Sequence, residues 1–148
     1  MGSEMCIRDR SILGPHISKG DVNGDGLDDF YIGGASNSAG ALFIQQNNSK
    51  FQTSSTSVWE TDKTYEDLES ILFDADGDKD LDLYVVSGGN AAQLNSTLYQ
   101  DRLYLNDGKG NFSKSNNLLP KINSSGGCLA VYDYDPVSYT HLTLPTKA

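Results

Sequence analysis

The sequence predicts an all-β fold made of about two four-stranded antiparallel blades of a β-propeller. The first observation is a repeat: an Asp-rich loop opens at Asp21 and again at Asp74, an offset of 53 residues. The second is that each loop runs into an apolar segment of strand type and then into a Gly-Gly pair, at 33–34 and 88–89. The third is a hairpin pattern later in each period. Four short strands per repeat are typical of a propeller blade.

In the first period, one strand leads into the acidic loop and the run Phe30-Tyr31-Ile32 leads out of it. A further strand is expected at 41–46, because Leu, Phe and Ile cluster there between polar segments. Residues 47–50 (Asn-Asn-Ser-Lys) form its turn, and the partner strand starts at Phe51. These elements complete one blade.

Residues 61–70 are the only helical candidate, and they are too short and too acidic to form a stable helix. We interpret them as the connection between the blades, and we expect Trp59 to pack between the blades. Residues 90–101 have no counterpart in the first period, so they are interpreted as a loop insertion. Such insertions often carry the binding function of a repeat protein, and a solvated loop without function is an equally good interpretation.

The second period repeats the plan. Leu83-Tyr84-Val85-Val86 follows its acidic loop, residues 102–106 form the third strand, residues 107–111 the turn, and the last strand starts at Phe112. A third period begins near residue 128, where Asp133 and Asp135 keep the spacing of a first and a third metal ligand. The chain is therefore expected to hold two blades and the start of a third.

Both ends of the chain have a different origin in this interpretation. Residues 1–10 back-translate as GTG GGC TCG GAG ATG TGT ATA AGA GAC AG, which resembles a transposon-based sequencing adaptor. Residues 137–146 back-translate as GTC TCT TAT ACA CAT CTG ACG CTG CCG ACG, which resembles read-through into the opposite adaptor. We therefore expect residues 1–10 and 136–148 to be adaptor artefacts, and residues 11–135 to be a partial propeller.

The charge balance excludes some partners and favours others. The chain has 11 Lys and Arg against 20 Asp and Glu, a formal charge of −9. Without the two terminal segments these counts become 8 and 18, and the charge becomes −10. Such a surface repels phosphate backbones and anionic lipids, so no nucleic-acid partner and no membrane insertion are expected. It attracts cations.

The two acidic loops have the ligand alternation of a calcium site. Calcium takes six to eight oxygen ligands, and carboxylates at every second position of a tight loop supply them. The candidate ligands, at positions one, three, five, seven and nine of each loop, are Asp21, Asn23, Asp25, the carbonyl of Leu27 and Asp29, then Asp74, Asp76, Asp78, the carbonyl of Asp80 and Asp82, with Asp133 and Asp135 beginning a third set. Glycine at positions four and six of the first loop permits the sharp turn. In the second loop, Lys79 stands at position six and departs from this pattern.

An EF-hand is excluded by the end of each loop. An EF-hand loop closes with a bidentate Glu at position twelve and continues into a helix. Position twelve here is Ile32 or Val85, neither of which offers a side-chain oxygen. The residues around them are β-branched and aromatic, which favours a strand. Position nine is therefore expected to close each site.

At these residues the chain resembles the FG-GAP, or VCBS, repeats of integrin α-subunit propellers and of cartilage-acidic-protein-like secreted proteins common in bacteria. The resemblance implies a propeller of about seven blades, bound Ca²⁺, and an extracellular or cell-surface location, which in a bacterium includes the periplasm and attachment to the outer membrane. It also implies adhesion, or the binding of an extracellular protein or glycan.

An enzyme is not expected. His16 is the only histidine within 11–135, and the sequence offers no Ser/His/Asp set and no His-rich metal site. The alternative that stays open is an accessory, non-catalytic propeller of a secreted hydrolase or lyase, whose catalytic domain would lie outside this fragment.

Overall fold

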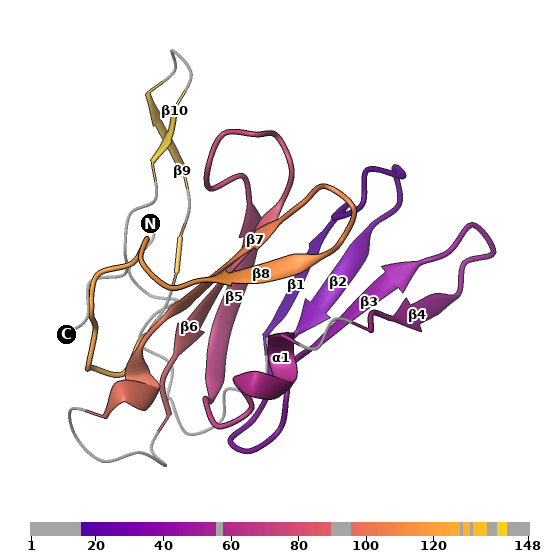
Figure 1. Ribbon diagram of the computed structural model, residues 1–148. Helices are drawn as coiled ribbons and strands as arrows, with labels where there is room; N and C mark the ends of the chain where they lie inside the picture. Colours follow the sequence, from indigo (N-terminus) through magenta and orange to yellow (C-terminus); the bar gives the residue numbers. More distant parts are fainter. Residues whose placement is uncertain are drawn as a thin grey trace, which may run out of the picture.

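Two four-stranded antiparallel sheets make up most of the computed structural model, which describes residues 16–55, 58–89, 96–127, 129–130, 132–135 and 139–141. In each sheet the strands pair in chain order, so each sheet is a meander (Figure 1). The first sheet contains β1 (Ile17–Gly20), β2 (Asp29–Ile32), β3 (Ala41–Gln45) and β4 (Phe51–Thr53). The second contains β5 (Asp67–Phe73), β6 (Asp82–Ser87), β7 (Arg102–Asn106) and β8 (Phe112–Ser115).

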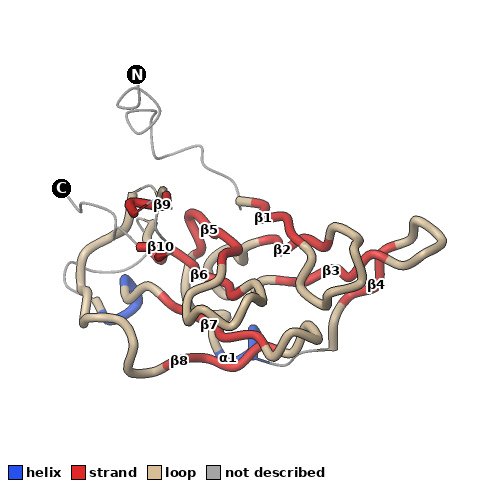
Figure 2. Tube along the Cα trace, turned by 90° about the horizontal axis from the view of Figure 1, so that it is seen from above, coloured by secondary structure: helices blue, strands red, loops and turns tan. Residues whose placement is uncertain are grey.

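The two sheets fan apart from their first strands. β1 and β5 lie next to each other, and the hydroxyls of Ser18 and Ser70 form a hydrogen bond between them. Seen from above, the sheets diverge from this line, so that β4 and β8 lie far from each other (Figure 2). The short helix α1 (Val58–Thr61) connects the sheets and contacts β8. This arrangement is that of two neighbouring propeller blades.

The strand registers show that the sheets are copies of each other. Asp29 pairs with Gly20 in the first sheet, and Asp82 pairs with Phe73 in the second. At the other edge, Gln45 pairs with Phe51 as Asn106 pairs with Phe112. Residues of β2 and β6 therefore correspond at an offset of 53, and residues of β3, β4, β7 and β8 at an offset of 61.

A hydrophobic core fills the space between the sheets. Its buried members are Val22, Tyr31, Leu42 and Trp59 on one side and Leu83, Val85, Tyr104 and Phe112 on the other. The Trp59 ring contacts the rings of Tyr31, Tyr104 and Phe112 at centroid distances of 5.1, 4.8 and 5.6 Å. The expectation that Trp59 packs between the blades is confirmed.

The far face of the second sheet is covered by the chain that follows it. Phe73, Tyr84, Val86 and Leu103 form a second buried cluster, and Leu119 and Leu129 pack against it. The amide of Gly126 donates to the carbonyl of Ser87 at 2.9 Å. The segment after β8 therefore covers the far face of the second sheet, as the second sheet covers one face of the first.

The far face of the first sheet is open and aromatic. Phe30 stacks on Phe43 at a centroid distance of 4.9 Å and meets the edge of Phe51 at 4.8 Å. Phe51 is 48% exposed and Ile17 is 57% exposed. A groove of about 420 Å³ runs over this face. The residues of the second sheet that correspond to the three phenylalanines are Leu83, Tyr104 and Phe112, which belong to the core between the sheets.

The predicted strands are confirmed on both sides of each acidic loop and in both hairpins. One prediction was wrong: residues 67–70 belong to β5 and not to the connection, because Asp67 is buried against Tyr31, Gly34 and Arg102. Part of the proposed insertion, residues 90–95, lies outside the described residues. In the described part of the chain, no helix is long and apolar enough to cross a membrane.

The ends of the chain stay a matter of prediction. Residues 1–10, 136–138 and 142–148 of the proposed adaptor segments lie outside the described residues. Between them, β10 (Tyr139–His141) pairs with β9 (Tyr132–Asp135) in a two-stranded sheet.

Candidate metal sites

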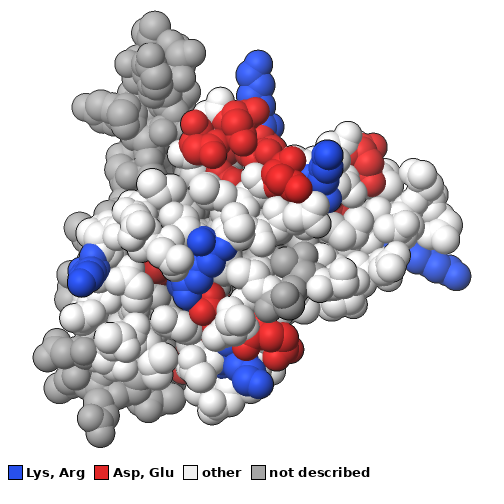
Figure 3. Space-filling model, viewed as in Figure 1, with Lys and Arg blue, Asp and Glu red and all other residues white. Residues whose placement is uncertain are grey.

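Both acidic loops join the first strand of a sheet to the second strand, so the repeat places them at the same end of the molecule (Figure 1). The loop between β1 and β2 spans 21–28, and the loop between β5 and β6 spans 74–81. The hairpin between β7 and β8 lies between them. Asp and Glu side chains gather over this end of the surface (Figure 3).

In the first loop, the Asp21 carboxylate is the centre around which the backbone turns. It accepts hydrogen bonds from the amides of Asn23, Gly24, Asp25 and Gly26, at 3.2, 2.7, 3.3 and 2.8 Å. Further along the loop, Asn23 Oδ1 accepts from the Asp25 amide and Asp25 Oδ1 accepts from the Leu27 amide. Every predicted side-chain ligand up to position five therefore faces the inside of the turn.

The second loop repeats four of these six bonds at the same positions. Asp74 accepts from the amides of Gly77 and Lys79 at 2.7 and 3.1 Å. Asp76 accepts from the Asp78 amide, and Asp78 accepts from the Asp80 amide. Two loops with different sequences thus share one backbone path.

That path needs a left-handed backbone at positions four and six. In the first loop Gly24 and Gly26 have φ of 75° and 81°. In the second loop Gly77 has φ of 87°, and Lys79 has φ of 77°. Lysine therefore keeps the turn in spite of its Cβ, at a conformational cost of roughly 1 kcal/mol.

Position nine is buried in both loops. Asp29 and Asp82 are each 0% exposed. Asp29 accepts from the amides of Val22 and Gln45, at 3.1 and 2.8 Å. Asp82 accepts from the amides of Ala75 and Asn106, at 2.9 and 2.8 Å. Each of these carboxylates therefore ties its loop to the third strand of its own sheet.

The second loop fits a calcium ion by its donors and by their spacing. Carboxylate oxygens of Asp74, Asp76 and Asp78 all lie within 4.8 Å of one another. Two oxygens that share one ion at the usual 2.3 to 2.6 Å are at most about 5 Å apart. All the donors are oxygens, which a hard cation prefers. These three residues would hold the ion, which would neutralise part of their charge.

The electrostatics of the loops show the strain of crowded carboxylates. Desolvation, followed by the hydrogen bond and charge of Asp78, raises the pKa of Asp80 to about 6. Desolvation raises the pKa of Asp82 as well, and that of Asp29, against the effect of their backbone donors. Desolvation also acts to raise the pKa of Asp21, but its four backbone donors outweigh this effect and lower it.

Asp80 distinguishes the second loop from the first. It stands at position seven, where the first loop has Leu27. Its Oδ1 atom is buried and has no hydrogen-bond partner among the described residues. The sequence predicts only a carbonyl ligand at this position, and the fifth carboxylate adds to the negative charge of the second loop.

The third candidate set differs from the first two. Asp133 and Asp135 lie in strand β9, paired with β10, where the earlier repeats have a loop. The glycines and later ligands of the motif do not follow Asp135, so the backbone has no reason to form the same turn. The side chains of both residues lie outside the described part of the structure, and their role as ligands stays a prediction.

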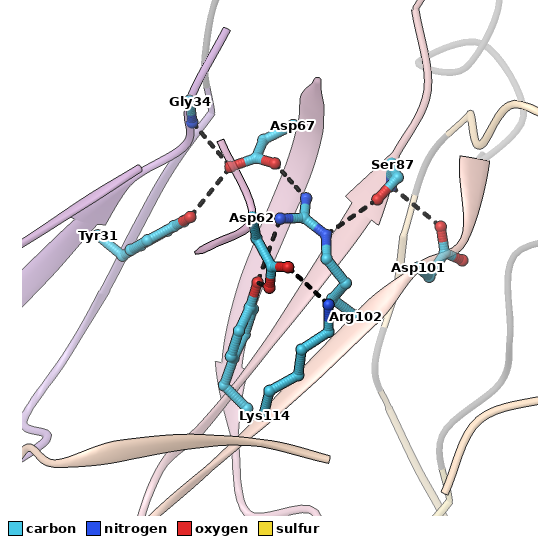
Figure 4. A network of polar contacts seen from close by, with 9 residues as sticks. Tyr31, Gly34, Asp62, Asp67, Ser87, Asp101, Arg102 and Lys114 are labelled. Atoms are coloured by element: carbon cyan, nitrogen blue, oxygen red, sulfur yellow. Dashed lines mark hydrogen bonds and ion pairs between the residues drawn. The ribbon is translucent and has the colours of Figure 1, made fainter. Parts of the chain in front are cut away.

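A buried polar network at the boundary between the sheets was missed by sequence reasoning. Arg102 is 3% exposed and pairs with Asp67, which is 6% exposed (Figure 4). Asp67 also accepts from the Tyr31 hydroxyl at 3.0 Å and from the Gly34 amide at 2.7 Å. Burial alone would lower the pKa of Arg102, but the charge of Asp67 raises it, so the ion pair persists.

The network extends through the sheet to the surface. The Tyr104 hydroxyl donates to Asp62 at 2.6 Å, and Lys114 pairs with the same carboxylate at 2.7 Å (Figure 4). The guanidinium of Arg102 lies over the Tyr65 ring, 4.5 Å from its centroid. These residues come from both sheets and from the connection, which no local sequence pattern brings together.

Comparison with known proteins gives one family. The family model described as FG-GAP-like repeat matches the chain twice, over residues 21–85 and 74–136. Each match begins at the first Asp of an acidic loop. No curated protein is similar enough to count as a match.

Proposed function

Because the chain belongs to the FG-GAP-like repeat family, we propose that it is a calcium-binding, non-catalytic β-propeller segment. It acts outside the cell, in adhesion or in binding a protein or glycan ligand. The observation that carries the calcium proposal is the repetition of the loop geometry. Two loops with different residues at positions three, six and seven keep the bonds from the amides at positions five and seven to the side-chain oxygens at positions three and five.

Calcium would act on the stability of the loops. The alternating positions hold three carboxylates in the first loop and five in the second. These carboxylates repel one another, and a divalent ion removes that repulsion. The ion would hold the first strand of each blade to the second strand at the end where both loops lie. A partner would then meet neighbouring loops on a rigid frame.

A weak calcium site would suit the proposed extracellular location. Extracellular calcium modules bind with dissociation constants on the order of 10⁻⁴ to 10⁻³ M, and sites of this affinity stay filled outside cells. The acidic balance of the chain favours a cationic ligand at the loops and disfavours nucleic acid.

Calorimetric titration of the full chain with calcium tests the proposal. We expect about two ions per chain, one lost in Asp25→Ala, one lost in Asp78→Ala, and both lost in the double variant. The matched control is Asp28→Ala, which removes an exposed acidic residue of the first loop that is paired with Lys19 and is not a predicted ligand. A folded chain that binds no calcium would disprove the proposal, and so would an equal loss in Asp28→Ala.

A further inference from the structure

We infer that Asn106, in the second sheet, is a positioning residue for both calcium loops, including the loop of the first sheet. This inference rests on the proposed calcium function and adds a residue that lies outside both acidic motifs. Asn106 is the last residue of β7 and is 8% exposed. Its contacts join the two loops directly.

Every polar atom of the Asn106 side chain is used. Nδ2 donates to the carbonyl of Val22 at 2.7 Å and to the carbonyl of Leu81 at 3.1 Å. Oδ1 accepts from the amides of Asp107 and Gly110, at 2.9 and 3.1 Å. A flipped amide would place its oxygen against two carbonyls and its nitrogen against two N–H groups. The orientation of the side chain is therefore fixed by its surroundings.

The two carbonyls belong to different loops. Val22 is the second residue of the first loop, and its amide donates to Asp29. Leu81 is the eighth residue of the second loop and precedes Asp82. One NH₂ group therefore holds each loop at a peptide next to a predicted ligand.

The hairpin that Asn106 opens rests on both loops as well. A Cβ atom on Gly110 would lie 3.7 Å from Val22 Cγ2 and 3.9 Å from Asn23 Cβ. A Cβ atom on Gly108 would lie 3.1 Å from Asp80 Oδ2. The hairpin therefore lies close beside position three of the first loop and position seven of the second, and Oδ1 of Asn106 fixes the hairpin in that place.

Gln45, which corresponds to Asn106 in the first sheet, shows that the role of the backbone amide is separate from that of the side chain. The amide of Gln45 donates to Asp29 as the amide of Asn106 donates to Asp82. The Gln45 side chain, however, lines the groove on the open face. In both repeats a backbone amide of the third strand therefore holds the aspartate at position nine. The bonds that join the two loops are made by the side chain of Asn106.

Asn106→Asp tests the inference, because it keeps the shape and the Oδ1 acceptor and removes the NH₂ donor. The effect is measured by calorimetry in two backgrounds, Asp78→Ala with only the first loop intact and Asp25→Ala with only the second. We expect calcium affinity to fall about tenfold in both backgrounds. The added negative charge would attract calcium, so a loss in affinity reports the replacement of the NH₂ donor by an oxygen that faces the carbonyls of Val22 and Leu81.

The control is Asn48→Asp, an equal change in the exposed hairpin of the first sheet, where Oδ1 accepts from the Lys50 amide. We expect it to leave both affinities unchanged. A purely local role of Asn106 in its own sheet would weaken only the second loop, and that result would overturn the inference. Unchanged affinity in both backgrounds would also overturn it. Failure of the calcium proposal itself is recognised separately, because the parent chain would then bind no ion.

A second measurement does not depend on the folding of the Asn106 variant. In the Asp78→Ala and Asp25→Ala chains, the NMR signals of the Asn106 side-chain NH₂ group are followed as calcium is added. We expect them to shift when either loop alone is filled. A side-chain signal that responds to only one loop would contradict a position shared by both.

Discussion

The two repeats agree in their loops and differ in how each sheet is joined to the chain that follows it. At the first junction, the Tyr31 hydroxyl and the Gly34 amide both donate to Asp67, which comes from the next sheet. At the second junction, the corresponding Tyr84 hydroxyl and Ser87 amide donate to Asp101, which lies just before β7 of the same sheet. One bonding requirement is thus met by carboxylates from different places in the chain.

Side-chain volume explains why the two junctions use carboxylates from different places in the chain. The amide of Asp67 donates to the Gly34 carbonyl as the amide of Gly126 donates to the Ser87 carbonyl, so residues 67 and 126 occupy equivalent places. Opposite Asp67 stands Gly33, and opposite Gly126 stands Val86. A Cβ atom on Gly126 would collide with Val86 Cγ1. The second junction therefore has no room for the carboxylate that the first one uses.

The largest difference is expected from charge removal at the two junctions. Asp67→Asn leaves the buried Arg102 cation without its anion, which should lower the free energy of unfolding by about 4 kcal/mol. Asp101→Asn weakens bonds from a hydroxyl and an amide, which carry no charge, and should cost about 1 kcal/mol. Urea unfolding of both variants measures the difference. Equal losses would show that the two carboxylates do the same work.

A smaller effect is expected from volume. Gly126→Ala should lower the free energy of unfolding by about 1–3 kcal/mol, because the new methyl group overlaps Val86. Val86→Ala in the same chain should restore part of the loss, and a double-mutant cycle in urea measures this coupling.

The first junction supplies the control for that cycle. Gly33→Ala places its methyl carbon 2.8 Å from Asp67 Cβ and should also destabilise the chain. Val86→Ala should not rescue it. If Val86→Ala restored stability at both junctions, it would act by loosening the fold in general and not by relieving the overlap between residues 86 and 126.

The acidic loops were largely predictable from the sequence because their geometry is local. The spacing of Asp, Asn and Gly over nine positions determines which amides reach which carboxylates, and the strands after the loops follow from β-branched and aromatic runs. Asp67 and Arg102 were not predictable in this way, since 35 residues separate them and no period connects them. Asp101 was predicted to lie in a loop insertion, either a binding loop or a solvated one, although it is 2% exposed and fills the place of a missing carboxylate.

Asn106 shows the same limit within the site. The turn at 107–111 was predicted from its Asp and Gly residues, but its contact with the first loop depends on how two sheets pack. Such a contact follows from the tertiary structure and leaves no local signal in the sequence.

The smallest effect is expected within the loops themselves. Lys79→Gly should raise the free energy of unfolding by about 1 kcal/mol, because glycine accepts the φ of 77° that lysine adopts there under strain. Gly26→Ala, at the same position of the first loop, should lower it by a similar amount. Both are measured by urea unfolding with a chelator present, so that calcium does not contribute. A destabilising Lys79→Gly would mean that the lysine side chain compensates for its backbone.

The position of Trp59 makes the boundary between the sheets visible by spectroscopy. The chain has one tryptophan, so the tryptophan emission, excited selectively, comes from a single site. The indole is 5% exposed and lies against rings from both sheets. Parting of the sheets would bring water to it and shift the emission to longer wavelength, whereas circular dichroism follows the strands themselves. A chain whose emission changes before its dichroism would be opening along this boundary, with both blades still folded.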